Sequence, residues 1–469
     1  MNNQRLYGLM QVMALFFFLI FFPAITAAQN APDGQHPRKT WKNRPERIWV
    51  TNENKTNETP FSFIFQQDTA SEITVLRVLI AAGKKAEPLN RKGLAFLTTR
   101  LAVEIPGTSD AIKLMTLGSS LAVDVEGDYS CITVTCLSEN LDETIKIVAG
   151  VLKEPLFSAL RISSVKNNMT YRQKNEEDNT EFLMEREYLH VFLGNSGYGG
   201  SIFGTAAGDS TSLHTIKKKD IEDFYNAFFN RAHMAVVVSS DLSSTEIETV
   251  IKKYFLPLSP GQPGQLVQPV QQKESEEIKP AEKKEYFFKK ENTQALVSLG
   301  ALLPGMSPNH FVCALMLENL VGGGIGSRIW PLRVDLNLAY SLKAKSIQWK
   351  DAGIIWVYLK TDNSRKEKAS RALPEIVADL YKDGVSEEEF NMIKVRTRAH
   401  FLRINETKEM RTFYLGLFEL TGPGFDFFEN FFSAMDTLTA SDFNAYIRQV
   451  LKPDQLVKII IGPGEPAVE

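Results

Sequence analysis

Alternating hydrophobic and polar positions mark short strands along this chain, and longer hydrophobic periods mark helices. Residues 73–79 (ITVLRVL) and 131–137 (CITVTCL) alternate as half-buried β-strands do. Residues 140–152 carry apolar side chains three and four positions apart, which predicts a helix, and residues 386–403 predict another. Strands and helices of both kinds in one chain favour the α+β class.

The same order of elements occurs twice, and three pairs of segments lie a constant 222 residues apart. The pairs are ITVLRVL at 73–79 with ALVSLGA at 295–301, CITVTCL at 131–137 with GIIWVYL at 353–359, and the last helix and strand beginning at Asp220 with those beginning at Asp442. A repeat of this length predicts two copies of one fold. We expect each copy to be a mostly antiparallel sheet with helices packed on one face.

Composition sets the boundaries of the two copies. Residues 257–291 contain PGQPG, several glutamines and runs of Lys and Glu, which is typical of a solvated linker. The first domain is therefore predicted over 61–256 and the second over 292–469, with an N-terminal extension over 29–60.

The first 28 residues have the pattern of a secretory signal peptide. Arg5 precedes a mainly apolar stretch from Leu9 to Ala28, which small residues close. The alternative is an uncleaved membrane anchor, but a spanning helix needs about 20 apolar residues, and Pro23 interrupts this stretch. We therefore expect export, to a periplasm or out of the cell.

The net charge and the cysteines bear on two further questions, nucleic-acid binding and disulfide bonds. The formal net charge of −3 over 469 residues gives no reason to expect nucleic acid as a partner. Cys131 and Cys136 lie at an odd separation in one predicted strand and so face opposite sides of the sheet. We expect these two and Cys313 to be small core residues with no disulfide between the first two.

Several local patterns, in order along the repeat, resemble the two-domain M16 (pitrilysin/insulinase) peptidases. They are GDY at 127–129, EPLF at 154–157, YGGSIFGT at 198–205, and VGGGIGSRI at 321–329 followed by Arg333 and LAYS at 338–341. The resemblance implies that both domains have the metallohydrolase fold of the mitochondrial processing peptidases. It also implies that the substrates are peptides or small unfolded proteins.

The resemblance locates a zinc motif whose ligands are replaced here. Catalytic M16 members carry His-x-x-Glu-His on the first helix of the first domain, where two histidines on one helix face hold zinc and the glutamate takes a proton from the bound water. Residues 93–95 (GLA) match the residues before the motif, so Phe96 and Arg100 stand at the histidine positions and Thr99 at the glutamate position. The distal glutamate ligand falls near 172–176. We therefore expect this chain to bind no metal and no other cofactor.

A second set of family residues is retained. Arg333 and Tyr340 match the arginine and tyrosine with which the second domain of catalytic members closes over the substrate. A tyrosine hydroxyl suits the oxygen on which negative charge develops, and the fork of an arginine suits a substrate carbonyl or carboxylate. The structural alternative is that Arg333 pairs with Asp335 or a glutamate, and that Tyr340 is a half-buried strand residue.

The glycine run before this pair resembles the glycine-rich loop of the family's second domain. By that resemblance Gly322, Gly323 and Gly324 are expected to contact the substrate. The run is not a phosphate-binding loop, because no Gly-Lys-Ser/Thr follows it.

A chain that lacks the zinc ligands and keeps Arg333 and Tyr340 resembles one subunit of a two-chain M16 peptidase. We expect an accessory subunit of an exported heterodimeric zinc metalloendopeptidase, inactive alone, whose homologous partner supplies His-x-x-Glu-His and the zinc. The first alternative is a catalytically inactive M16-like protein that binds peptides or acts as a scaffold. The second is an independent peptidase with a different kind of site.

The N-terminal pattern makes the first testable prediction. The mature protein is expected to begin near Gln29 and to be soluble, because the apolar stretch is removed on export. N-terminal sequencing of the exported protein measures this. An intact Met1 on a chain retained in the membrane would support the anchor instead.

Overall fold

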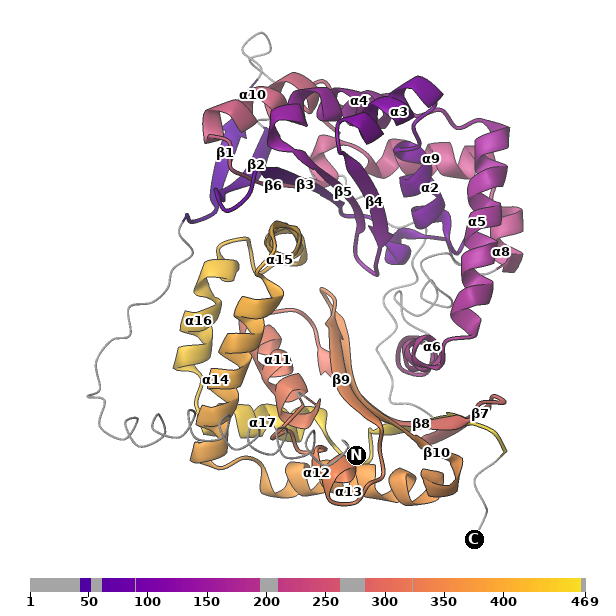
Figure 1. Cartoon of the computed structure of the whole chain (residues 1–469), viewed down its shortest axis with the longest axis vertical. Helices are drawn as coiled ribbons and strands as arrows, with labels where there is room; N and C mark the ends of the chain where they lie inside the picture. Colours follow the sequence, from indigo (N-terminus) through magenta and orange to yellow (C-terminus); the bar gives the residue numbers. More distant parts are fainter. Residues whose placement is uncertain are drawn as a thin grey trace, which may run out of the picture. The chain divides into compact units, whose positions relative to one another are not determined.

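The computed structural model describes residues 43–51, 61–88, 90–194, 210–261, 283–322 and 324–464. It confirms the α+β class, with one sheet and its helices in each half of the chain (Figure 1). The predicted signal peptide over 1–28 lies outside the described residues. Within the described segments, no helix is both long enough and apolar enough to cross a membrane.

The first sheet has six strands in the order β1-β2-β6-β3-β5-β4. These strands are β1 (Glu46–Val50), β2 (Phe61–Gln67), β3 (Ile73–Ile80), β4 (Ser120–Val125), β5 (Ser130–Leu137) and β6 (Met234–Ser240). Strands β2 and β6 pair in parallel and the other neighbours are antiparallel. Strand β1 lies in the range predicted as an extension, so the first sheet begins earlier than predicted. Its residues are ordered by pairing with β2 and carry no alternation of their own.

The helices of the first half follow the hydrophobic pattern. They are α2 (Leu94–Ala102), α3 (Thr108–Thr116), α4 (Leu141–Lys153), α5 (Ala159–Glu177), α6 (Thr180–Leu193), α8 (Ser210–Thr215), α9 (Lys218–Phe228) and α10 (Ser244–Tyr254). The helix predicted over 140–152 is α4, and it buries Leu141, Ile145, Val148 and Leu152 along one face. Cys131 and Cys136 are buried in β5 and, like Cys313, are free, as predicted.

The second sheet has five strands in the order β7-β11-β8-β10-β9. These are β7 (Glu285–Lys289), β8 (Gln294–Pro304), β9 (Ser341–Gln348), β10 (Ala352–Asp362) and β11 (Val457–Gly462). Its helices are α11 (Pro308–Gly322), α12 (Pro331–Val334), α13 (Lys366–Asp383), α14 (Glu387–Ile404), α15 (Lys408–Thr421), α16 (Phe427–Thr437) and α17 (Ala440–Val450). Strand β7 lies inside the predicted linker over 257–291, and that part of the prediction is wrong. The strand forms because it pairs with β11.

The two sheets repeat one topology. In the first, β2 is parallel to β6, which is antiparallel to β3, followed by β5 and β4. In the second, β7 is parallel to β11, which is antiparallel to β8, followed by β10 and β9. The repeat read from the sequence is therefore a repeat of the fold.

Each sheet receives a helix from the other half of the chain. Helix α6 packs on β8 and β11 of the second sheet, and α15 packs on β3 and β6 of the first. A sheet thus has helices of its own half on one face and a helix of the opposite half on the other, a feature that the repeat alone does not predict (Figure 1).

Close packing holds both exchanged helices. Tyr188 of α6 is fully buried, donates to Ser298 Oγ at 2.9 Å and lies so close to Gly300 that a Cβ there would overlap its ring. On α15 the relation is reversed, since Gly416 is the residue whose Cβ would overlap Leu79 of β3. At both contacts a glycine permits the close approach of a helix and a strand.

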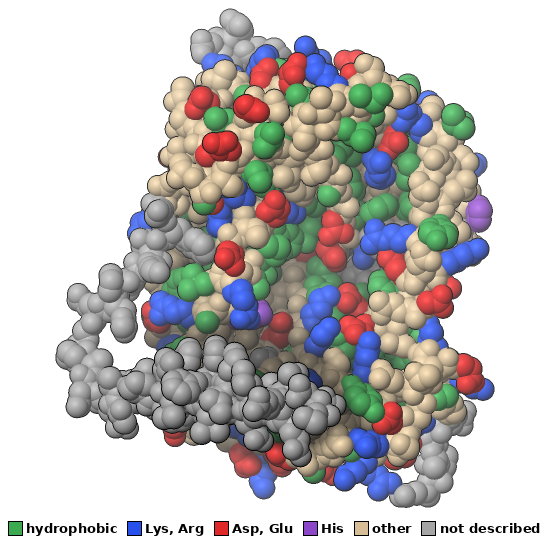
Figure 2. Space-filling view, viewed as in Figure 1, with side chains coloured by type: hydrophobic (Ala, Val, Ile, Leu, Met, Phe, Trp, Pro, Cys, Tyr) green, Lys and Arg blue, Asp and Glu red, His purple; other side chains and the backbone are tan. Residues whose placement is uncertain are grey.

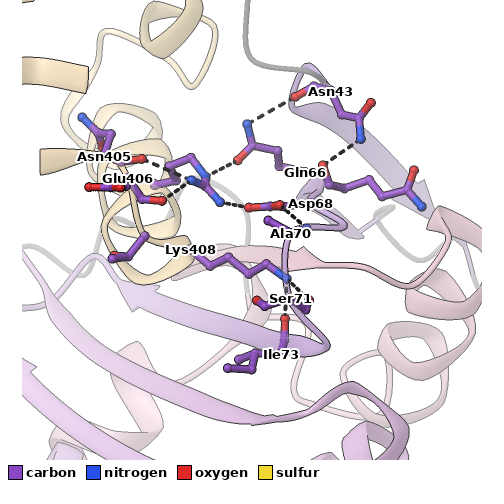
Figure 3. Close-up of polar contacts among 12 residues, drawn as sticks. Asn43, Gln66, Asp68, Ala70, Ser71, Ile73, Asn405, Glu406 and Lys408 are labelled. Atoms are coloured by element: carbon purple, nitrogen blue, oxygen red, sulfur yellow. Dashed lines mark hydrogen bonds and ion pairs between the residues drawn. The ribbon is translucent and has the colours of Figure 1, made fainter. Parts of the chain in front are cut away.

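A buried polar cluster joins α15 to the first half (Figure 3). Arg411, only 5% exposed, forms an ion pair with Asp68 and donates to Gln66 Oε1 at 3.1 Å. It also donates to the backbone carbonyls of Asn405 and Glu406, at 3.2 and 2.8 Å. A buried guanidinium with several acceptors compensates for its desolvation, and it ties the loop before α15 to the end of β2.

Lys408, in the first turn of α15, adds contacts to the start of β3. Its Nζ donates to the carbonyl oxygens of Ser71 and Ile73, at 2.8 and 2.7 Å. These bonds fix the first turn of α15 beside the start of β3.

Charged residues also attach α6 to the second sheet. Glu181 accepts from Tyr358 Oη at 2.5 Å and pairs with Lys360 at 2.7 Å, and Glu185 pairs with Lys345 at 3.0 Å. Burial alone would raise the pKa of Glu181, but the bonds from Lys360 and Tyr358 hold it below its ordinary value. The carboxylate form of Glu181 therefore belongs to the folded state.

Replacing Arg411 with Met tests how much the buried polar cluster around Arg411 and Asp68 contributes to stability. The free energy of unfolding is expected to fall by about 3 kcal/mol, because Asp68 is left partly buried without its cation. Urea unfolding followed by circular dichroism measures the change. Lys219→Met is the control, since Lys219 is 81% exposed and its pairing with Asp223 should matter by less than about 0.5 kcal/mol. If both variants change the free energy of unfolding equally, the buried Arg411–Asp68 pair does not have the stabilising role assigned to it.

Candidate functional site

Helix α2 carries the residues that stand at the zinc-motif positions. It begins after Gly93, whose φ of 92° lies in the left-handed region that favours glycine. The Glu87 carboxyl accepts from the backbone N–H groups of Gly93 at 3.1 Å and Ala95 at 2.8 Å. Burial raises the pKa of Glu87 to about 8. Sequence reasoning missed Glu87, because it lies outside the helix and has no motif spacing.

Phe96 occupies the first histidine position and is part of the core of the first half. The guanidinium of Arg172 on α5 lies 5.6 Å from the centroid of the Phe96 ring, and Arg172 Nε is 2.7 Å from Glu176 Oε1. The structure therefore brings together Phe96 and the 172–176 segment, where the distal ligand falls by resemblance. A phenyl ring and a guanidinium fill this position, and neither binds zinc.

Thr99 and Arg100 complete the replaced motif. Thr99 is buried and its hydroxyl donates to the carbonyl of Ala95 at 2.6 Å, which is a bond within the helix. Arg100 Nη2 pairs with Glu104 Oε2 at 2.7 Å, and Arg161 reaches the other oxygen of Glu104 at 3.3 Å. Phe96 and Thr99 are thus buried packing residues, and Arg100 forms an ion pair at the surface.

The residues present do not fit the zinc that the family implies. Over the described part of the chain, no three His, Cys, Asp or Glu side chains lie together so that they could hold a metal ion. Catalytic zinc needs three protein ligands. No step of a reaction can be assigned to a metal on α2.

Arg333 lies in the last turn of α12, and Tyr340 lies at the end of the connection from α12 to β9. Pro331 occupies the first position of α12, where its missing N–H disrupts no hydrogen bond. Arg333 is exposed, its guanidinium lies 5.4 Å from the Trp330 ring centroid, and no carboxylate in the described ranges pairs with it. The predicted alternative of a pair with Asp335 is therefore not what the structure has.

Tyr340 immediately precedes β9, and its side chain is 51% exposed. Its backbone N–H donates to Lys360 O at 2.9 Å, and its hydroxyl donates to Asp362 Oδ2 at 2.5 Å. The hydrogen bond to Asp362 raises the pKa of Tyr340, so the hydroxyl stays protonated. Sequence reasoning did not identify Asp362, because it lies on β10 at the end of another segment.

The structure explains why two of the three predicted residues of the glycine-rich loop are glycines. A Cβ on Gly322 would overlap Ala344 of β9, so glycine allows the end of α11 to approach this strand. Gly324 has a φ of 88°, which favours glycine. Gly323 lies outside the described residues.

Two arginines fasten the remainder of the loop to α14. Arg328 binds both carboxylate oxygens of Glu389, at 2.7 and 2.6 Å. Arg396 Nη1 donates to the carbonyl of Gly326 at 2.9 Å. The loop is therefore held against α14, and Ile325 between the two glycines stays exposed.

Charges of both signs are mixed over the surface (Figure 2). Lysine and arginine side chains alternate with carboxylates on the face shown, and neither sign forms a continuous field there. The face shown therefore lacks the continuous basic patch that is typical of nucleic-acid-binding surfaces.

Two sequence descriptions of one family match consecutive parts of the chain. Residues 62–206 match the family described as Insulinase (Peptidase family M16), and residues 215–396 match the Peptidase M16 inactive domain. The first includes α2 with its replaced motif, and the second includes Arg333 and Tyr340.

Relatives and solved structures extend these matches to most of the chain. A Helicobacter pylori protein named non-peptidase homolog YmxG is 24% identical over 87% of this chain and 93% of its own length. A Bacillus subtilis protein named uncharacterized zinc protease YmxG is 19% identical over 86% of this chain and 96% of its own length. The crystal structure of a peptidase M16 inactive domain from Pseudomonas fluorescens has a TM-score of 0.76 at 18% identity, covering 90% of this chain and 98% of that one. The chain belongs to the M16 (insulinase) peptidase family.

Proposed function

We propose that this chain is the zinc-less subunit of an exported two-chain M16 peptidase. One contrast carries the proposal. Phe96 and Arg172 fill the metal position of the first domain, while Arg333 and Tyr340 of the second domain stay on the surface. A partner with His-x-x-Glu-His would supply the zinc, and this chain would supply contacts to the peptide.

The chemistry of Tyr340 suits an oxyanion donor. Its hydroxyl is kept protonated by Asp362 and is exposed, so rotation of one side-chain bond can exchange Asp362 for an oxygen of the substrate. A hydrogen bond to the attacked carbonyl strengthens as negative charge develops on its oxygen. Tyr340 would then favour the transition state over the bound peptide.

Arg333 suits the binding of the peptide itself. Its guanidinium lies over Trp330 and has no carboxylate partner within the described ranges, so its donors can face a substrate carbonyl or carboxylate. This interaction exists before the reaction begins, and it contributes to affinity.

A peptide-binding or scaffold protein is the second candidate. The observation that favours it is the bond from Tyr340 to Asp362, because a tyrosine already paired in this way can be a purely structural residue. The relatives include a protein named as a non-peptidase and another named as a zinc protease, so the family context admits both candidates.

The proposal predicts that the purified chain holds far less than one zinc per molecule after dialysis. Phe96, Thr99 and Arg100 provide no ligand, and a catalytic site needs three. Metal analysis by mass spectrometry measures the content. About one tightly held zinc per chain would contradict the proposal.

It also predicts separate effects of two substitutions when the zinc-bearing partner is present. Tyr340→Phe should lower the turnover of a peptide by roughly 100–1,000-fold, because one donor to the oxyanion is lost. Arg333→Ala should mainly raise the peptide concentration needed for half-maximal rate. Steady-state hydrolysis by the reconstituted pair, with complex formation checked by size, measures both.

Tyr171→Phe is the matched control for the tyrosine. Tyr171 is an exposed tyrosine on α5 in the first half, and losing its hydroxyl should leave turnover unchanged. If Tyr340→Phe behaves like Tyr171→Phe, Tyr340 has no part in the reaction and the scaffold candidate gains.

A further inference from the structure

Helix α14 exposes a row of apolar side chains on its outer face. Met392, Val395 and Leu402 are 55%, 70% and 37% exposed, and Ala399 between them is exposed as well. The opposite face of the helix is buried through Phe390, Ile393, Thr397 and Phe401. The helix is therefore apolar on two faces, although the core uses only one.

The row has the spacing of a helix-pairing surface. Its four members are three, four and three positions apart, as are the a and d positions of a coiled coil. Exposed apolar residues scattered singly need no explanation, but residues at this spacing lie next to one another on one helix face, as they do where two helices pair.

The repeat supplies an internal comparison. Helix α5 is the counterpart of α14. In each half a β-hairpin (β4–β5 or β9–β10) is followed by one helix (α4 or α13), then by α5 or α14, and then by the exchanged helix. The four buried positions of α5 lie 228 residues before those of α14, six more than the offset of the strands, so this spacing aligns the two helices. At the positions that match the apolar row, α5 exposes Ser164, Asn167, Tyr171 and Lys174. Because the same face of the same fold is mainly polar in one copy, the fold itself does not require the apolar row.

The positions that flank the row are basic. Arg396, Arg398 and Arg403 occupy the e and g positions beside it, and the remaining one is Asn391. Arg396 donates to Gly326 O, Arg398 lies 3.9 Å from Asp436 and 4.6 Å from the Phe432 ring centroid, and Arg403 contacts His400. No glutamate or aspartate stands at an e or g position.

We propose that this surface, defined by Met392, Val395, Ala399 and Leu402 with the three flanking arginines, binds an amphipathic helix of another chain that has apolar a and d residues and Glu or Asp at e and g. Such a helix would cover the row and pair with the arginines. Complementary e and g charges determine which helices pair and in which orientation.

A second copy of this chain does not suit the surface. Two α14 helices facing each other would bring arginines against arginines, and like charges across a helix pair are destabilising. The charge pattern therefore selects a partner of opposite sign. The inference concerns α14 alone and does not depend on the proposed role of Arg333 and Tyr340.

Two synthetic three-heptad peptides test it, with Leu at a and d and either Glu or Lys at e and g. Fluorescence anisotropy with the full chain should show binding of the Glu peptide at least about tenfold tighter than of the Lys peptide. Raising the salt concentration should weaken the binding of the Glu peptide. Val395→Glu should weaken it about tenfold or more.

Two further variants make the test specific. Asn167→Glu on α5 is the matched control at the equivalent position and should leave binding unchanged. The double variant Arg398→Glu with Arg403→Glu should reverse the preference toward the Lys peptide, which a loss of folding could not do. Circular dichroism confirms the fold of each variant.

Three results would overturn the proposal. One is that the unmodified chain does not bind the Glu peptide, or that the Val395→Glu and Asn167→Glu variants bind it equally well. Another is a dimer of the unmodified chain that Val395→Glu dissociates, which would make a second copy the occupant. The third is sedimentation with vesicles of anionic lipid that Val395→Glu abolishes, which would make the occupant a membrane surface.

Discussion

The exchange of α6 and α15 between the two halves is the interaction on which the rest of this structure depends. Each sheet has one face covered by its own helices and the other by a helix of the opposite half. Tyr188 against Gly300 and Gly416 against Leu79 allow approaches that a Cβ would prevent. Because each half completes the core of the other, neither sheet can be fully buried by its own segment of sequence.

The two sets of residues that match the family's active-site positions have different surroundings in this chain. Phe96 is part of a core that α2 shares with its own sheet, so its ring contributes burial where a ligand would need an open position. Arg333, on the short helix α12, and Tyr340, just before β9, are both exposed, so the core places no demand on their side chains. This contrast is the observation on which we propose that a partner chain supplies the metal and this chain supplies contacts to the substrate.

Sequence reasoning found what local pattern and repetition encode. The alternating strands β3 and β5, helix α4 and the repeat could be read directly, and so could the free cysteines. Strands β1 and β7 could not, because each is a short edge strand ordered by pairing with a neighbouring strand, β2 and β11 respectively, and neither has an alternating pattern of buried residues of its own. The exchanged helices, Glu87 beneath α2 and Asp362 beside Tyr340 depend on contacts between segments far apart in sequence, which no spacing reveals.

The most direct test of the account is peptide hydrolysis by this chain and by a two-domain M16 chain with His-x-x-Glu-His from the same source, each alone and mixed. The account predicts that this chain alone shows no hydrolysis, and that the zinc-bearing chain gains activity on mixing, with a maximum at equal amounts of the two. Full activity of the zinc-bearing chain alone, unchanged by this one, would contradict the account.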